Sequence, residues 1–206
     1  MCNSKEESVF HLLSNCAVLA PTLYKSRHDN ALKCFIWPVL QTLRLISTPT
    51  PKWYEQQEIK PHYRNDEAQV WWDIPEYGSK QDPSDRAQRP DAKIKIERNE
   101  EKKIYIVEMT VPWMSVRKEK YDYKRGKYVN ILNNLKLQNP DYEIDQITIV
   151  MDVYGGYDKE LIQNIEKIVT TKEDTRTIVQ NMQKVIISSL ANISRTFKVR
   201  SKLNIV

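Results

Sequence analysis

Two strands joined by a short polar turn constrain the fold of this chain more than any other feature. The strands are expected over 92–97 and 103–111, with the turn between them. If the turn is a two-residue loop at 99 and 100, residues that face each other have numbers that sum to 199. Asp91 and Glu108 satisfy this relation. Opposed residues have Cβ atoms about 4.5–5.5 Å apart, so the register predicts two neighbouring carboxylates.

Two carboxylates this close repel each other, and a divalent cation between them would relieve the repulsion. Glu108 lies in an apolar run that extends from Ile104 to Met109, where an unpaired charge is costly. Oxygen ligands without a neighbouring His or Cys suit magnesium or manganese, which keep several waters and borrow phosphate oxygens from a substrate. The alternative is structural: Glu108 ends its strand at the surface and Asp91 caps a turn after Pro90.

The helix expected over 116–138 carries a lysine that could pair with these two carboxylates. Its apolar residues recur every three or four positions, which marks its core-facing side: Tyr121, Tyr128, Ile131 and Leu135. Lys124 falls on the same stripe, where its ammonium group is costly unless it meets an anion. The carboxylates of Asp91 and Glu108, with a bound phosphate, would supply that anion. The alternative is a lysine whose stem packs and whose head reaches water.

The order of these residues resembles the PD-(D/E)XK pattern of restriction-like nucleases, with Thr110 where that pattern has its lysine. The restriction-like endonuclease domain of site-specific non-LTR retrotransposons departs in the same way, because its Lys, two residues, Lys-Tyr arrangement lies on the following helix. Lys124, Lys127 and Tyr128 are similar to that arrangement. Further similar elements are Trp72-Asp73, Arg89-Pro90-Asp91 and Val111-Pro112.

The resemblance implies an α/β fold, a restriction-endonuclease-like mixed sheet of about four strands flanked by helices. It also implies a metal-dependent DNA endonuclease that nicks target DNA. Asp91 and Glu108 would hold one or two Mg²⁺ or Mn²⁺ ions, and Lys124 would orient the attacking water or stabilise the extra charge. Lys127 and Tyr128 would support the same face.

The implied partners are DNA, the element RNA and a reverse transcriptase domain that is absent from this chain. Cleavage would leave a 3′-hydroxyl for target-primed reverse transcription, so the chain would be a fragment of a larger polyprotein. Two other interpretations stay open. One is a catalytically inactive remnant or domesticated domain that still binds nucleic acid. The other is a structural domain unrelated to DNA.

The first residues contain possible zinc ligands, with His11 and Cys16 in a His-x4-Cys spacing and Cys2 upstream. The same retrotransposon family carries a Cys-x2-Cys-x(7–8)-His-x4-Cys knuckle before its nuclease. The resemblance therefore implies a truncated zinc-knuckle-like segment at 1–20 and the endonuclease domain at 21–206. Three ligands alone should bind zinc weakly. Alternatively, His11 and Cys16 flank an ordinary amphipathic helix.

A second helix is expected over 23–46, with Arg27 and His28 near its start. These two residues resemble an Arg-His stretch of the same retrotransposon domain. The resemblance implies that Arg27, His28 and Arg89 contact nucleic acid. The alternative for the helix is a solvated first turn in which Asp29 interacts favourably with the helix dipole.

Composition is compatible with these interpretations without selecting among them. The net charge of +5 and the pI near 8.9 permit an acidic partner but do not require one. No apolar run reaches the roughly 18 residues that a membrane span requires, and no signal peptide opens the chain. The three cysteines give no disulfide framework. We expect a soluble intracellular protein without membrane partners, nuclear when it acts on DNA.

Overall fold

The computed structural model describes residues 8–55, 57–76, 88–98 and 100–203, with side chains as far as residue 197. Within that part the chain forms a mixed five-stranded sheet in the order β1-β2-β3-β4-β5. Neighbouring strands from β1 to β4 are antiparallel, and β5 is parallel to β4. The strands are β1 (His62–Arg64), β2 (Ala68–Trp72), β3 (Ala92–Arg98), β4 (Glu101–Thr110) and β5 (Glu143–Val150). The expected α/β class is confirmed, with one strand more than the four or so expected.

The additional strand is β1, which pairs with β2 through three residues. A side chain closes the turn between them: Asn65 Oδ1 accepts hydrogen bonds from the backbone N–H groups of Glu67 (2.9 Å) and Ala68 (2.7 Å), as asparagine commonly does in turns. The polar sequence His-Tyr-Arg lacks the apolar alternation of a typical strand, so β1 gives little signal in the sequence.

The β3–β4 hairpin has the expected register. Pairs run from Ala92 with Val107 to Arg98 with Glu101, and their numbers sum to 199 throughout. Alternation along β3 explains this choice, because its buried residues Ala92, Ile94 and Ile96 all face one side of the sheet. A shift by one residue would turn that apolar set to the other side.

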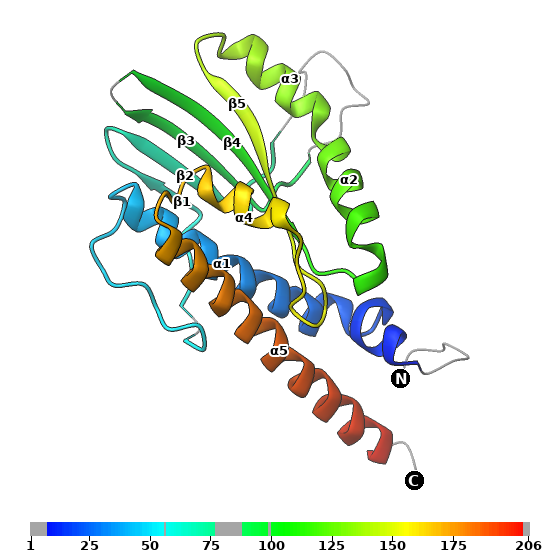
Figure 1. Ribbon diagram of the computed structural model, residues 1–206. Coiled ribbons are helices and arrows are strands. Elements are labelled where there is room, and N and C mark those ends of the chain that lie inside the picture. The colour runs from blue at the N-terminus through cyan, green and yellow to red at the C-terminus, as the bar shows by residue number, and fades with distance from the viewer. Residues whose placement is uncertain (1–7, 56, 77–87, 99, 204–206) are drawn as a thin grey trace.

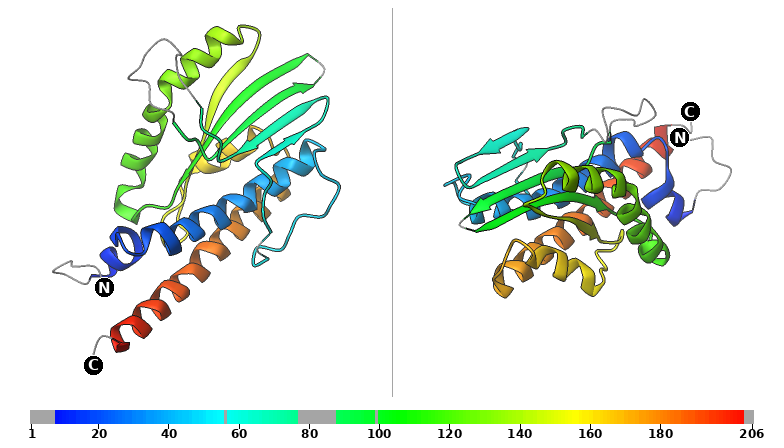
Figure 2. Two further views of the ribbon diagram at one scale, coloured as in Figure 1. Left: turned by 180° about the vertical axis from the view of Figure 1, so that it is seen from behind. Right: turned by 90° about the horizontal axis from the view of Figure 1, so that it is seen from above.

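Helices cover the sheet on both sides (Figures 1 and 2). We call the side that packs on α1 and α5 the inner face, and the side that carries α2 and α3 the outer face. The helix α4 also packs on the inner face. The helices are α1 (Lys25–Thr42), α2 (Arg117–Lys127), α3 (Val129–Gln138), α4 (Lys159–Glu166) and α5 (Lys172–Leu203).

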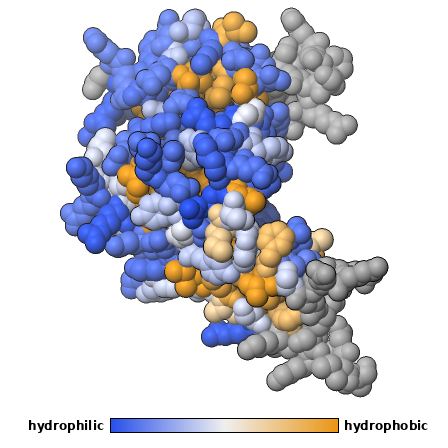
Figure 3. Space-filling view, turned by 45° about the vertical axis from the view of Figure 1, so that its right-hand side comes forward, coloured by the Kyte–Doolittle hydropathy of each residue, from blue (hydrophilic) through white to orange (hydrophobic). Residues whose placement is uncertain are grey.

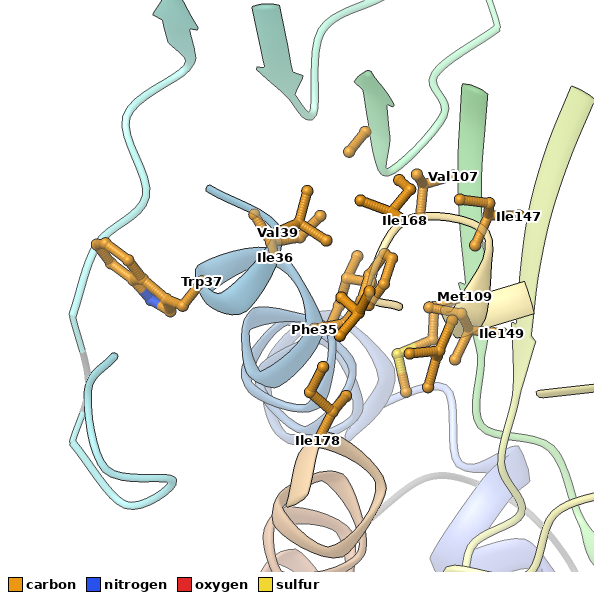
Figure 4. Close-up of a cluster of buried hydrophobic side chains, with 14 of the residues drawn as sticks. Phe35, Ile36, Trp37, Val39, Val107, Met109, Ile147, Ile149, Ile168 and Ile178 are labelled. Carbon is orange, nitrogen blue, oxygen red and sulfur yellow. The ribbon is translucent and has the colours of Figure 1, made fainter. Parts of the chain in front are cut away.

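The main core fills the space between the inner face and the helices, as the close-up in Figure 4 shows. Phe35 of α1 and Met109 of β4 point into this core, together with Ile178 of α5. Each fully buried side chain of this size contributes about 1.5–3 kcal/mol through removal of its apolar surface from water. Residues 104–109 of β4 are all buried, and β4 is paired on both sides by β3 and β5, so the strand holds Glu108 in a fixed position.

The prediction of a single helix over 116–138 is wrong, because α2 and α3 are separate helices that meet at Tyr128. Tyr128 has φ −105° and ψ 11°, which interrupts the helix there. The break turns the Tyr128 ring under α3, where it packs against Ile106 and Ile131 and is completely buried. Burial of this ring outweighs continuation of the regular helix. The helix expected over 23–46 is also shorter, since α1 ends at Thr42; it continues through Pro38.

The described residues of the expected zinc-knuckle-like segment pack on the body of the protein. The two short helices η1 (His11–Asn15) and η2 (Ala20–Tyr24) precede α1. Leu13, Cys16 and Leu19 form a small core with Val153 and Ile193.

Much of the surface in Figure 3 is hydrophilic, with apolar side chains in several places, at the top of the view as well as in its lower half. Exposed apolar residues occur near the start of the described chain, at Val9, Phe10 and Val18. Such scattered apolar exposure is normal for a folded protein. In the part of the chain that the structure describes, no helix is long and apolar enough to cross a membrane.

A buried ion pair fixes the start of α2 to the loop after β5. Asp152 is 2% exposed, and its Oδ2 accepts a hydrogen bond from Arg117 Nη1 at 2.6 Å. Its Oδ1 accepts the backbone N–H groups of Tyr154 and Gly156, both at 2.9 Å. A Cβ on Gly156 would lie 2.5 Å from Asp152 Oδ2 and 2.7 Å from Arg117 Nη1, so a larger residue would displace the ion pair.

We therefore expect Gly156→Ala to lower the free energy of unfolding by about 1–3 kcal/mol, the usual cost of overpacking. Gly126→Ala is the matched control, because a Cβ on Gly126 of α2 meets nothing within 4 Å. Alanine is the better helix former by about 0.5–1 kcal/mol, so this control should be neutral or stabilising. Urea unfolding measures both variants, and equal stability of Gly156→Ala and wild type would contradict this packing.

Candidate active site

Glu108 is the centre of a buried polar cluster. Its side chain, on the outer face of β4, is only 3% exposed. One carboxylate oxygen, Oε1, contacts the ammonium groups of Lys124 and of Lys127, the latter at 3.4 Å. The other oxygen, Oε2, accepts a hydrogen bond of 2.6 Å from the Tyr128 hydroxyl. The expectation that Lys124 points toward the carboxylates of Asp91 and Glu108 is confirmed for Glu108.

The helix α2 brings both lysines to Glu108 because residues three apart lie on the same side of a helix. Lys124 is further fixed through its backbone: its carbonyl oxygen accepts a hydrogen bond of 3.0 Å from Gln146 Nε2. Gln146 is a buried residue of β5, next to β4 in the sheet. The sheet therefore positions both the carboxylate and the helix that carries its cations.

Tyr128 remains protonated in this cluster. Burial, followed by its hydrogen bond to Glu108, raises the pKa of Tyr128 well above its ordinary value. Its hydroxyl oxygen accepts a hydrogen bond of 2.7 Å from Lys127 Nζ and lies 3.1 Å from the carbonyl oxygen of Arg89. Tyr128 is thus a hydrogen-bond donor that orients Glu108, and it cannot serve as a base near neutral pH.

Asp91 lies beside Met109, the residue that follows Glu108 in β4. Its Oδ2 accepts a hydrogen bond of 2.6 Å from the backbone N–H of Met109 and lies 3.2 Å from His28 Nε2. His28 reaches Asp91 from α1, whereas the partners of Glu108 come from α2 and the start of α3. The separation of the two carboxylates, expected to be about 4–6 Å from cross-strand spacing, stays a prediction.

His28 is held between two aspartates. Its Nδ1 lies 2.9 Å from Asp29 Oδ1, and its Nε2 lies near Asp91 and 3.2 Å from the Met109 carbonyl oxygen. Burial alone would lower the pKa of His28, but the hydrogen bonds to Asp29 and Asp91 outweigh burial and raise it to about 10. The ring is therefore a cation at neutral pH. It borders a cavity of about 120 Å³ that Asp29, Asp73 and Asp91 also line.

This arrangement predicts a pH-dependent stability in chelator. Because the folded-state pKa of His28 lies above its ordinary value of 6.5, its contribution is fully present below about pH 6.5 and is lost as the pH rises through about 10. The difference in free energy of unfolding between wild type and His28→Gln should be largest near pH 6 and shrink toward pH 10. Urea unfolding at several pH values measures it; a constant difference would contradict the assignment.

The two arginines expected to contact nucleic acid differ in exposure. Arg27 is 3% exposed; its Nη1 donates to the Leu13 carbonyl oxygen at 2.9 Å, and its guanidinium lies over the Tyr24 ring. Burial lowers the pKa of Arg27 to about 10. Arg27 therefore supports the N-terminal segment and does not present its charge to a phosphate in this conformation. Arg89 is 62% exposed and contacts Asp73 at 3.1 Å, so most of its guanidinium is accessible.

Zinc ligation by the first residues stays a prediction. Cys2 lies outside the described residues. Cys16 is buried in the small N-terminal core, and His11 is half-buried on η1. Among the residues that the structure describes, no three His, Cys, Asp or Glu side chains come together as a metal site.

The comparisons with known proteins add no relative. No protein-family model matches the chain, and a search of curated proteins finds no match.

Sequence reasoning missed two partners in the site. The first is His28 as the neighbour of Asp91, which lies 63 residues away in the sequence. The second is Gln146, whose side chain holds the Lys124 backbone from β5. Neither has a local sequence signal, because both contacts form only when α1 and β5 pack beside β4.

Proposed function

We propose that this chain is a metal-dependent DNA endonuclease of the restriction-like type, which nicks target DNA for insertion of a non-LTR retrotransposon. The convergence of Lys124, Lys127 and Tyr128 on Glu108 carries the proposal. A buried ion pair is often no more stabilising than apolar residues of similar volume, so fold stability alone does not account for a buried carboxylate with two lysines. It is the arrangement expected of a site that binds a cation and a phosphate.

The donor set fits magnesium or manganese. Both hydrogen bonds described for Asp91 go to Oδ2, which leaves lone pairs of Oδ1 for another ligand. Glu108 would supply the second carboxylate, since each carboxylate oxygen has two acceptor sites. Magnesium commonly binds through one or two carboxylates, with waters and substrate phosphates completing its shell. When bound, such an ion would stabilise negative charge on the phosphate and lower the pKa of water.

The remaining roles belong to the chain itself. The Lys124 ammonium stabilises the charge that develops on the phosphate during cleavage. Tyr128 holds Glu108 in one orientation, and protonated His28 holds Asp91 against the Met109 backbone. Arg89, exposed at the rim of the site, contacts a neighbouring phosphate of the substrate.

Incubation of the chain with supercoiled plasmid tests the proposal. We expect conversion to the open-circular form in Mg²⁺ or Mn²⁺ and none in chelator. The expected cleavage is slow and little dependent on sequence. A chain that binds plasmid but leaves it supercoiled in both metals would contradict the proposal.

One observation favours a second candidate, a nucleic-acid-binding module without cleavage. Glu108 already has donors on both oxygens, and the lysines neutralise the charge that would attract a cation. A remnant that kept this network for stability would retain the fold and its basic residues. The plasmid assay separates the two candidates, because a binding module shifts plasmid mobility without nicking it.

A further inference from the structure

The outer face of β1, β2 and β3 carries two cross-strand rows of basic and aromatic side chains. The first row is His62, Trp71 and Lys93, and the second is Arg64, Gln69 and Lys95. On β4 the rows continue into Ile106 and Ile104, and Ile106 is covered by Tyr128 and α3. His62 and Arg64 are exposed, and the other members of the rows are half-buried. Figures 1 and 2 show α2 and α3 beside β5, away from β1.

The first row is a preformed stack. The His62 ring lies parallel to the Trp71 ring, with centroids 5.0 Å apart and an interplanar angle of 16°. The ammonium of Lys93 lies 4.4 Å from the centre of the Trp71 ring. Trp71 therefore has partners in the sheet, whereas His62 on the edge strand is exposed. A flat ring fixed in this way offers a stacking surface at little entropic cost.

Cations surround this stack. Arg64 and Lys95 lie in the second row, and the Lys95 ammonium lies 4.9 Å from the centre of the half-buried Tyr142 ring. Acidic groups are also present: Glu76 contacts Lys93, and Glu97 lies 3.2 Å from Lys95. Arg64 adds a charge on the exposed edge strand. The surface thus combines charge that attracts phosphates with rings that stack on unpaired bases.

The rows lead directly to the proposed catalytic pair. Lys93 is two residues from Asp91 along β3, and its partner Ile106 is two residues from Glu108 along β4. The face that carries Glu108 is therefore continuous with the His62 row. The helices α2 and α3 occupy the side of β5, so a nucleic acid strand bound at the site on the outer face can continue over β3, β2 and β1.

We propose that the rows of His62 and Arg64 bind an unpaired DNA strand next to the scissile phosphate. Arg64 and Lys95 contact its backbone, and His62 stacks on one of its bases. The position of the scissile phosphate rests on the proposed endonuclease function, whereas binding of a single strand to this surface does not. A base-paired strand presents no free base to His62, so the surface prefers single-stranded over duplex DNA.

Fluorescence anisotropy with labelled oligo(dT) in chelator tests the proposal without any need for catalysis. His62→Ala should weaken binding about tenfold, as expected for loss of one base stack of about 1–3 kcal/mol. The double variant Arg64→Ala with Lys95→Ala should reduce the slope of log K against log salt by about 1.4, since each phosphate contact on a single strand contributes about 0.7. Both changes lie on the surface, and circular dichroism verifies the fold.

Matched control variants remove an aromatic ring or a cation from other parts of the protein surface. Tyr54→Ala removes an aromatic ring that is 58% exposed, and Lys136→Ala removes an exposed cation on α3; both should bind oligo(dT) as wild type does. Equal affinity of the row variants and these controls would overturn the proposal, as would tighter binding of a duplex hairpin than of oligo(dT). Oligo(rU) binding more tightly than oligo(dT) would overturn its assignment to DNA. Plasmid nicking is measured separately. A chain that binds oligo(dT) as proposed but does not nick plasmid contradicts the endonuclease function and not this binding surface.

Discussion

Asp91→Ala should reduce plasmid nicking at least about a thousandfold, which corresponds to about 4 kcal/mol of activation free energy. The substitution removes one of the two proposed metal ligands. It also removes a negative charge near the phosphate backbone, so affinity for DNA at fixed salt should hold or rise slightly. Catalysis and binding therefore move in opposite directions. Nicking is followed on agarose gels, and binding by anisotropy with labelled duplex.

Two further variants control for structural damage at Asp91. Asp91→Asn keeps an oxygen that accepts the Met109 N–H but lowers the affinity for a cation, so it should also lose nicking. Asp141→Ala removes a carboxylate that is 78% exposed and should nick like wild type. Wild-type rates from Asp91→Ala would eliminate Asp91 as a metal ligand.

Lys124→Ala should also reduce nicking, by at least about a hundredfold. This is the effect typical of losing one group that stabilises transition-state charge. DNA binding should change little, because Lys124 is 20% exposed and pairs with Glu108. The control is Lys120→Ala on the same helix, where the side chain is 43% exposed and lies 3.9 Å from Glu119. If both variants lose activity equally, the positive charge of α2 matters only for general attraction of DNA.

Much of this site was predictable because it depends on short-range rules. A two-residue turn fixes the hairpin register, which pairs Ala92 with Val107 and so brings the start of β3 beside the part of β4 that carries Glu108. Helical periodicity then places Lys124 on the side of α2 that faces the sheet. These predictions required only the alternation of side chains in strands and the 3.6-residue turn of a helix.

Other features depend on tertiary packing and could not be predicted in this way. The break at Tyr128 forms because its ring fits under α3 beside Ile106, and continuous helical periodicity gives no sign of it. Arg27 is buried because η1 places the Leu13 carbonyl against its guanidinium, whereas an arginine in a first helical turn is usually solvated. The short strand β1 lacks an apolar run, so only its pairing with β2 reveals it.

Titration of Mn²⁺ determines whether Asp91 and Glu108 hold one cation together. Isothermal titration calorimetry of the wild-type chain in the presence of a non-hydrolysable phosphorothioate DNA should detect a binding event that is lost in Asp91→Ala. The same event should be lost in Glu108→Gln and retained in Asp141→Ala. Loss of the site in both Asp91→Ala and Glu108→Gln is the predicted result; Mn²⁺ binding that either of these variants leaves unchanged would contradict a shared site.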